Sequence, residues 1–124
     1  MTRDARRQRG LQARDAGRRA EWVAALWLML HGWSIVGFRT RTPEGEIDLI
    51  IRRGTVLAGV EVKRRRSIEE ALDAVKPMQQ QRLLRAIGGI AARRPSWRHL
   101  DVRLDLVAIA PGRLPIHVPD VWRP

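Results

Sequence analysis

Two neighbouring segments that alternate apolar and polar residues constrain the fold of this chain most strongly. Residues 46–52 read EIDLIIR and residues 55–63 read TVLAGVEVK, with Arg53 and Gly54 between them. Segments rich in β-branched residues around a short glycine-containing turn are typical of a β-hairpin. The sequence therefore predicts a hairpin, and its pairing decides which side chains come together.

The register of this hairpin has two alternatives. A two-residue loop at 53–54 would pair position 48 with 59, whereas a loop at 54–55 would pair it with 61. In both registers Asp48 and Glu61 share a face, with side-chain bases within about 8 Å. Lys63 lies two residues beyond Glu61 on that face, because side chains alternate along a strand. The opposite face of the first strand is predicted to enter the core with Ile47, Leu49 and Ile51.

The remaining segments predict a mixed α/β domain. Residues 17–32 are almost continuously apolar, which indicates a mostly buried first helix that ends at Gly32. We further predict a strand over 33–40, a turn at 42–45, a loop or short helical turn over 67–75, a helix over 77–93, and strands over 101–110 and 116–118. The inward stripe of the second helix is predicted to contain Leu83, Leu84, Ile87 and either Ile90 or Ala91. The expected fold is a mixed central sheet flanked by helices, in the order helix, strand, strand, strand, helix, strand, short strand.

The chain length and the arginine distribution suggest one domain behind a basic arm. A chain of 124 residues is within the usual size of a single domain. Residues 1–16 carry several arginines and lack apolar periodicity, so they are expected to form a basic N-terminal arm. This arm either is solvated and frayed or grips phosphate. Residues 17–124 are expected to form the α/β domain.

The charge balance points to nucleic acid as the first partner to consider. The chain has 24 Lys and Arg against 13 Asp and Glu, a formal net charge of +11. Polyphosphates attract such a protein, and their binding weakens steeply with salt. No uninterrupted apolar run approaches 18 residues, and no signal-peptide cleavage pattern follows the basic start. We therefore expect a soluble cytoplasmic protein that does not bind membranes.

The predicted pair of carboxylates suggests a divalent metal. Like charges that face each other across a ladder are destabilising, so a cation is expected between Asp48 and Glu61. The chain has no cysteine, so a metal must bind oxygen or imidazole. Mg²⁺ or Mn²⁺ suits carboxylate oxygens and can also contact a phosphate oxygen. Lys63 is placed to orient or deprotonate an attacking water, or to neutralise the transition state. These groups are sufficient for phosphodiester hydrolysis.

Other charged residues near the hairpin have two interpretations each. Glu21 either completes the metal site from the first helix or is a first-turn glutamate stabilised by the helix N-terminus. The spacing alone leaves both open. The cluster that directly follows Lys63 either contacts phosphate or is simply solvated; it comprises Arg64, Arg65 and Arg66. Arg19, at the end of the basic arm, is a further candidate nucleic-acid contact.

Four segments of the chain resemble the YraN family of bacterial proteins. They are residues 17–33, 45–50 (GEIDLI), 59–65 (GVEVKRR) and 103–107. That family is similar to the restriction-endonuclease-like superfamily, with its PD-(D/E)xK signature, and to archaeal Holliday-junction resolvases. The resemblance covers about residues 17–118. It implies a restriction-endonuclease-like fold and a metal site that contains Glu21, Asp48 and Glu61, with Lys63 assisting.

The chain departs from the superfamily pattern at three places. Ile47 precedes the aspartate where the signature has proline, although GEID is the usual form in the YraN-like group. The second helix offers Gln79 and Gln80 where the group often has a lysine, and either could orient a phosphate or a water. Leu104 takes a position that is often aromatic, which we interpret as a core substitution.

The leading functional prediction is a metal-dependent endonuclease that acts on DNA, branched or single-stranded, with DNA favoured over RNA. The alternative is a non-catalytic nucleic-acid-binding module that uses the same basic surface. A homodimer is compatible with the resemblance, because resolvases act on two strands.

Several further residues are predicted to be structural. Arg103 and Asp105 share a strand face and are expected to form an ion pair. The histidines are expected at the surface or at helix ends and are not assigned to the site; they are His31, His99 and His117. Core packing is expected for Trp22, Trp27 and Trp33. Trp97, which lies among arginines, is either structural or able to stack on an unpaired base.

Overall fold

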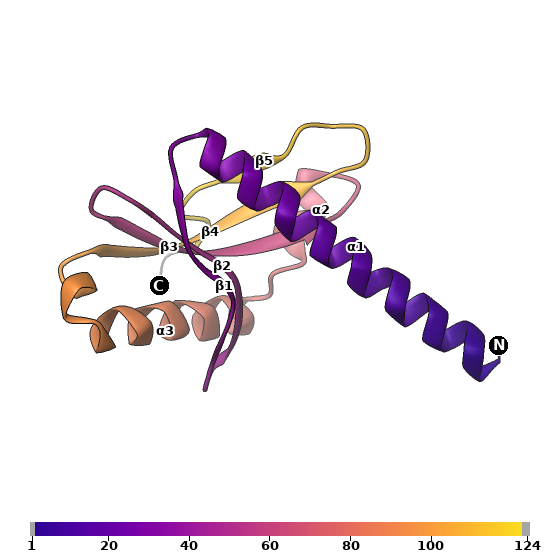
Figure 1. Cartoon of the computed structure of the whole chain (residues 1–124), viewed down its shortest axis with the longest axis horizontal. Helices are drawn as coiled ribbons and strands as arrows, with labels where there is room; N and C mark the ends of the chain where they lie inside the picture. Colours follow the sequence, from indigo (N-terminus) through magenta and orange to yellow (C-terminus); the bar gives the residue numbers. More distant parts are fainter. Residues whose placement is uncertain (1, 123–124) are drawn as a thin grey trace.

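The computed structural model describes residues 2–122, and describes their side chains except those of residues 11–16. The elements in chain order are α1 (Arg3–Leu30), β1 (Ser34–Thr42), β2 (Gly45–Arg53), β3 (Val56–Arg64), α2 (Ile68–Asp73), α3 (Pro77–Arg93), the 3₁₀ turn η1 (Pro95–Trp97), β4 (Asp101–Ile109) and β5 (Ile116–Val118). Figure 1 shows α1 and α3 on opposite faces of the sheet. No helix within the described residues is long and apolar enough to cross a membrane.

The five strands form one mixed sheet in the order β1-β2-β3-β4-β5. The first three strands are antiparallel to one another, β4 lies parallel to β3, and β5 is antiparallel to β4. A parallel pair needs a long crossover connection, and here α2 and α3 provide it. The predicted mixed sheet flanked by helices, with a short last strand, is confirmed.

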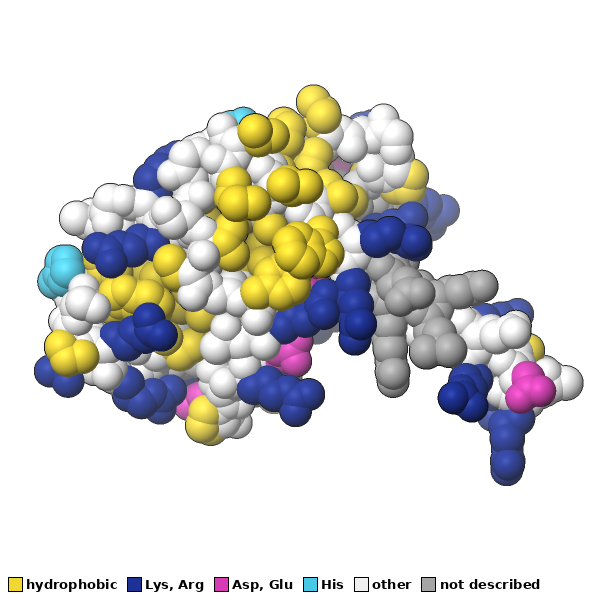
Figure 2. Space-filling model, viewed as in Figure 1, with side chains coloured by type: hydrophobic (Ala, Val, Ile, Leu, Met, Phe, Trp, Pro, Cys, Tyr) yellow, Lys and Arg dark blue, Asp and Glu magenta, His cyan; other side chains and the backbone are white. Residues whose placement is uncertain are grey.

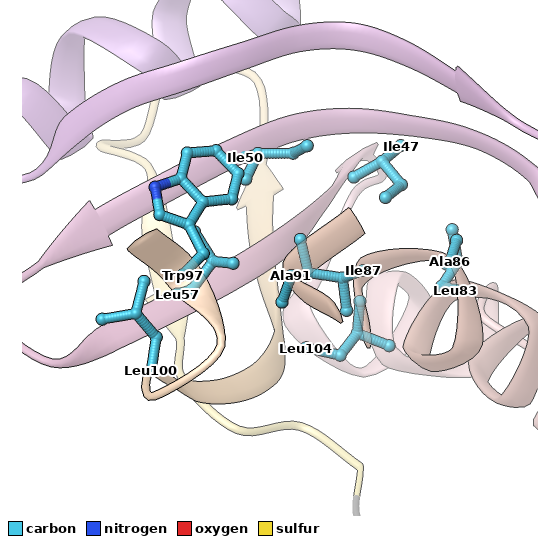
Figure 3. Close-up of a cluster of buried hydrophobic side chains, with 10 residues drawn as sticks. All are labelled: Ile47, Ile50, Leu57, Leu83, Ala86, Ile87, Ala91, Trp97, Leu100 and Leu104. Atoms are coloured by element: carbon cyan, nitrogen blue, oxygen red, sulfur yellow. The ribbon is translucent and has the colours of Figure 1, made fainter. Parts of the chain in front are cut away.

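Three apolar clusters pack on the two faces of the sheet, and the smallest joins the α2 segment to β4 through Ala71, Val75, Leu106 and Ala108. The core beneath α3 is drawn in Figure 3 and contains Ile47, Ile50, Leu57, Leu83, Ala86, Ile87, Ala91, Trp97, Leu100 and Leu104. The core beneath α1 contains Ala24, Ala25, Leu28, Trp33, Leu49, Ile51, Ala58, Val60 and Val107. The predicted inward stripe of α3 is confirmed, with Leu84 and Ile90 partly buried beside it. Because both faces of the central strands are covered, these strands have little polar surface except at their ends.

The hairpin adopts the second of the two predicted registers. Leu49 lies opposite Val60 and Arg53 opposite Val56, so the turn is at Gly54 and Thr55. Gly54 has φ 59°, a left-handed conformation that glycine adopts without steric cost. Extended by one residue, this register brings Asp48 level with Glu61.

The predicted alternation along β2 is wrong at one residue. Ile47 is buried as expected, but it packs with Ile50 on the α3 side, whereas Leu49 and Ile51 face α1. The β2–β3 pairing ends at Leu49, just before Asp48. A strand that leaves its ladder is free to rotate, so its next side chain can reach the other face.

Two predictions about α1 are also wrong. The helix begins at Arg3 instead of residue 17, so the basic arm is helical; the side chain of Thr2 caps it by accepting the Ala5 N–H at 3.2 Å. The helix is not mostly buried either. Its buried side chains lie along one face, and its outer face is apolar and exposed, with Trp22 58% exposed beside Phe38. Core packing was predicted for Trp22, Trp27 and Trp33, but only Trp33 is buried, with 5% of its surface exposed.

Trp97 is a core residue and does not present its ring to solvent. It is 6% exposed and packs in the α3 core, with the Arg94 guanidinium 4.1 Å from the ring centroid on its outer side. The interpretation as a base-stacking residue is therefore wrong. The indole of Trp97 thus packs η1 against the core beneath α3.

Candidate active site

An open cleft of about 440 Å³ lies where α1 crosses the ends of the two hairpin strands. Its walls come from α1, β2, β3 and the segment after β3, and they comprise Gly17, Ala20, Glu21, Asp48, Glu61, Val62, Lys63, Arg64 and Arg65. The structure thus brings all four predicted site residues, Glu21, Asp48, Glu61 and Lys63, to one cleft. Asp48, Glu61 and Lys63 come from the β2–β3 hairpin, and Glu21 comes from α1, which is distant in the sequence.

Asp48 is positioned by the end of the β2–β3 ladder. Its Oδ2 accepts a hydrogen bond from the Val62 N–H at 2.9 Å, in the place where a strand carbonyl would otherwise be. This contact fixes the Asp48 carboxylate beside Glu61 while satisfying a backbone donor. The end of regular β2–β3 pairing at Leu49 therefore places the Asp48 carboxylate in the site.

Glu61 and Lys63 form an ion pair on the same face of β3. The Lys63 Nζ lies 3.1 Å from the Glu61 Oε1, and the Glu61 side chain is almost fully buried. The pair involves one oxygen of the Glu61 carboxylate. Lys63 is therefore held within reach of any group that binds the carboxylates.

Burial changes the protonation of the two carboxylates. Burial, followed by the charge of Glu61, raises the pKa of Asp48 to about 7, and the Val62 N–H offsets only part of this. Burial also raises the pKa of Glu61, although Lys63 opposes the shift. Near neutral pH, binding of a cation would therefore stabilise the ionised forms of Asp48 and Glu61, which is the electrostatic condition for a cation site.

Glu21 reaches the same cleft but has a partner of its own. The Arg39 Nε donates a hydrogen bond to the Glu21 Oε2, which makes an ion pair between α1 and β1. Arg39 has φ 47°, an unusual conformation for a non-glycine residue, and it lies in β1 at the level of Asp48. Non-glycine residues in this region cost on the order of 1–3 kcal/mol and cluster at functional sites.

The sequence does not identify Arg39 as a residue of the site. It is one of many arginines in the chain, and nothing in its local pattern distinguishes it from the others. Its pairing with Glu21 and its backbone conformation become visible only in the folded chain.

The carboxylates suit a metal that takes few protein ligands. Within the part of the chain that the structure describes, no group of three or more His, Cys, Asp or Glu side chains could by itself hold a metal ion. Asp48 and Glu61 offer two carboxylates. Mg²⁺ commonly binds one or two carboxylates and completes its shell with water and substrate phosphate. Glu21, whose Oε2 pairs with Arg39, is the candidate for a third carboxylate ligand.

Gln80, and not Gln79, lies next to the site. It lines a small pocket with Glu61, and its Nε2 donates a hydrogen bond to the Val75 carbonyl at 2.8 Å. Its Oε1 is buried and has no partner within the described chain. A buried acceptor of this kind is available to a water or a ligand.

Exposed arginines surround the opening of the cleft. Arg64 and Arg65 line it directly, whereas Arg66 lies 3.6 Å from Glu70 and is partly neutralised. Arg19 is exposed on α1. Arg18 lines an adjacent hollow together with Glu21 and Arg39.

The predicted ion pair between Arg103 and Asp105 is confirmed away from the cleft. The Arg103 Nε donates to the Asp105 Oδ1 at 2.9 Å, and the Asp105 side chain is fully buried. His117 also bonds to this carboxylate, at 2.7 Å, and is not a surface residue as expected. His31 does lie at a helix end, where its ring bonds to the Trp27 carbonyl.

Sequence comparisons place the chain among bacterial relatives. The model of the family described as Uncharacterised protein family UPF0102 matches residues 20–109, which include Glu21, Asp48, Glu61 and Lys63. A UPF0102 protein of Caulobacter vibrioides is 60% identical over 122 residues, which cover 98% of each chain. A UPF0102 protein of Parvibaculum lavamentivorans is 49% identical over 93% of this chain and 86% of its own length. A UPF0102 protein of Paramagnetospirillum magneticum is 44% identical over 90% of this chain and 89% of its own length. The chain therefore belongs to the YraN-like UPF0102 family.

Proposed function

We propose that this protein is a divalent-metal-dependent endonuclease that hydrolyses phosphodiester bonds of DNA. The observation that supports the proposal best is the convergence of Asp48, Glu61 and Lys63 in one cleft bordered by arginines. A buried carboxylate and a partly buried one beside an ammonium group have little structural value, because removing like charges from water together costs free energy. A catalytic role explains why the fold accepts that cost.

The chemistry of each group follows from its surroundings. Asp48 and Glu61 would hold Mg²⁺ or Mn²⁺, which when bound supplies Lewis acidity toward a phosphate oxygen and neutralises both carboxylates. Lys63 then stabilises the negative charge that develops on the phosphoryl oxygens, or orients the attacking water. The unpartnered Oε1 of Gln80 is available to accept a hydrogen bond from a water near Glu61. Glu21 would add a third carboxylate to the site, with Arg39 beside it as a cation for a phosphate.

The arginines of α1 support nucleic acid as the substrate. Successive members of the series Arg3, Arg7, Arg18 and Glu21 are separated by nearly whole numbers of helical turns. These four side chains therefore lie on the same face of α1. Figure 1 shows α1 crossing the sheet and continuing past it toward the N-terminus. The helix face that enters the cleft thus continues as a basic stripe. A polyphosphate along this stripe would be led to the carboxylates.

The arrangement of elements resembles the restriction-endonuclease-like superfamily and the archaeal resolvases. As in the PD-(D/E)xK signature, an aspartate on one strand precedes a Glu-x-Lys pair on the next, and a glutamate comes from the first helix. This resemblance favours DNA over RNA and favours branched or single-stranded forms.

A cleavage assay tests the proposal. Wild type and Lys63→Ala should be incubated with Mg²⁺ or Mn²⁺ on flap, junction and single-stranded DNA and on RNA. Loss of the ammonium should slow metal-dependent cutting by about 10² or more, because a charge-stabilising group is removed from the site. Lys76→Ala is a matched control, since Lys76 is the other lysine of the chain and is exposed at the start of α3. Equal cutting by all three proteins would point to a contaminating nuclease and overturn the assignment.

A non-catalytic nucleic-acid-binding module is the second candidate. It is favoured by the ion pairs that Glu61 and Glu21 already make with Lys63 and Arg39. In that case wild type would bind DNA with strong salt dependence, but no metal would produce cutting.

A further inference from the structure

Helix α1 has a second apolar face that the fold leaves uncovered. Ala24, Ala25 and Leu28 pack on the sheet, while apolar residues also cover the opposite side of the same helix. We define the α1 outer patch as Trp22, Val23, Leu26, Met29 and Leu30 together with the neighbouring Val36 of β1. Figure 2 shows hydrophobic side chains gathered over this half of α1, with Lys and Arg side chains at their border. A helix that is apolar all round is normally buried.

The spacing of the patch fits another helix. Trp22, Leu26 and Met29 follow one another at intervals of four and three residues, which is the a/d spacing of helix pairs. Val23 and Leu30 are seven residues apart and flank this seam. The seam is a convex ridge of side chains, and ridges of this kind interlock with a second copy of themselves.

The area of the patch also suits a protein interface. Leu30 is 81% exposed, Trp22 58% and Leu26 56%. The six side chains leave roughly 600 Å² of apolar surface to solvent, at the top of the range for the largest patch on a monomer. A standard interface buries about 800 Å² on each partner, so the patch and its polar rim would provide enough surface.

We propose that the α1 outer patch is a homodimer interface in which two α1 helices pack antiparallel about a two-fold axis near Leu26. The patch itself contains no ionisable side chain, so two strongly basic chains can meet there with little repulsion. The antiparallel direction places Arg18 and Arg19 of the two copies at opposite ends of the seam. A parallel pair would bring these arginines side by side. An isologous two-fold contact is also the commonest arrangement of homo-oligomers.

Sedimentation equilibrium of the full chain tests the mass. Wild type should have twice the monomer mass of 14.2 kDa, and Leu26→Glu should have the monomer mass. Met78→Glu is the matched control, because Met78 is 72% exposed on α3, outside the patch, and its substitution should leave the dimer intact. Helix content by circular dichroism should be equal in all three, since each substituted side chain faces solvent.

Single cysteines test the arrangement, since the chain has none of its own. Leu26→Cys should form a disulfide-linked dimer on oxidation, because a residue on the two-fold axis lies opposite its own copy within the ~7 Å that a disulfide spans. Met78→Cys should not. A wild type that stays monomeric, a dimer that survives Leu26→Glu, or equal cross-linking of the two cysteine variants would overturn the proposal. Flotation of a monomeric wild type with anionic vesicles would then assign the patch to a membrane surface.

Discussion

At the scale of single residues, Asp48 shows how a site depends on an irregularity. Regular β-pairing would have satisfied the Val62 N–H with a carbonyl, but the strands separate and the Asp48 carboxylate takes that role. The same carboxylate is then forced close to Glu61. Its raised pKa is thus a consequence of backbone geometry as well as of burial.

Asp48→Asn should stabilise the protein in the absence of metal. The folded pKa of Asp48, about 7, is above its ordinary value of 3.8, so the folded chain binds the extra proton. Wild type therefore loses stability as pH rises from about 4 through 7, and an asparagine does not. Thermal unfolding at pH 8 should give a gain on the order of 1–3 kcal/mol that disappears toward pH 4.

Asp73→Asn provides the comparison for this change, because Asp73 is exposed at the end of α2. It should stay within about 0.5 kcal/mol of wild type at both pH values. If Asp48→Asn were less stable than wild type at pH 8, the ionised Asp48 carboxylate would stabilise the folded protein, which would contradict this prediction.

The residues of the site differed in how far the sequence could predict them. Asp48, Glu61 and Lys63 follow from strand alternation, which places them on predictable positions of a hairpin whatever its exact register. Glu21 had two open interpretations, because the packing direction of a helix is a tertiary property. Arg39 could not be found at all, since its role depends on a tertiary ion pair with Glu21 and on its backbone conformation.

At the scale of elements, α3 and the strands were predictable because local chemistry and tertiary packing agree there. Pro77 begins α3 and its apolar stripe has helical spacing, so both criteria gave the observed bounds. The start of α1 was not predictable from apolar periodicity, because residues 3–10 lie almost entirely in solvent. The exchange of faces at Ile47 required knowledge of where the β2–β3 ladder ends.

The attachment of β5 to the sheet depends on one buried carboxylate. Asp105 of β4 accepts hydrogen bonds from Arg103, from His117 of β5 and from the Asp120 N–H. Burial alone would raise its pKa, but the bonds from His117, the Asp120 amide and Arg103 outweigh burial and lower the pKa. Asp105 thus joins the edge of the sheet to the segment that follows it.

Asp105→Asn should lower the free energy of unfolding by about 3–5 kcal/mol at neutral pH, because the largely buried Arg103 guanidinium loses its counter-charge. Since the folded pKa is below the ordinary value, this stabilisation exists above about pH 4 and is lost as pH falls further. Denaturant unfolding at pH 7 and pH 3 measures the difference. Asp101→Asn, at the exposed start of β4, should have almost no effect, and an equal effect of both would argue against the network.

At the scale of the whole molecule, one helix connects three features. α1 contributes Glu21 to the cleft, continues as a basic stripe at its N-terminal end, and presents the outer patch on its opposite face. The charge of +11 was evident from composition, but its distribution along a helix required the fold. A dimer through α1 would link two clefts and send two basic stripes in opposite directions.

Calorimetric titration of Mn²⁺ at pH 8 tests the central claim most directly, because it asks whether Asp48 and Glu61 form a cation site without requiring a substrate. Wild type should bind one Mn²⁺ per chain, Asp48→Asn and Glu61→Gln should lose this binding, and Asp73→Asn should retain it. A wild type that gives no heat of binding, or an Asp48→Asn variant that binds Mn²⁺ as well as wild type does, would contradict the account.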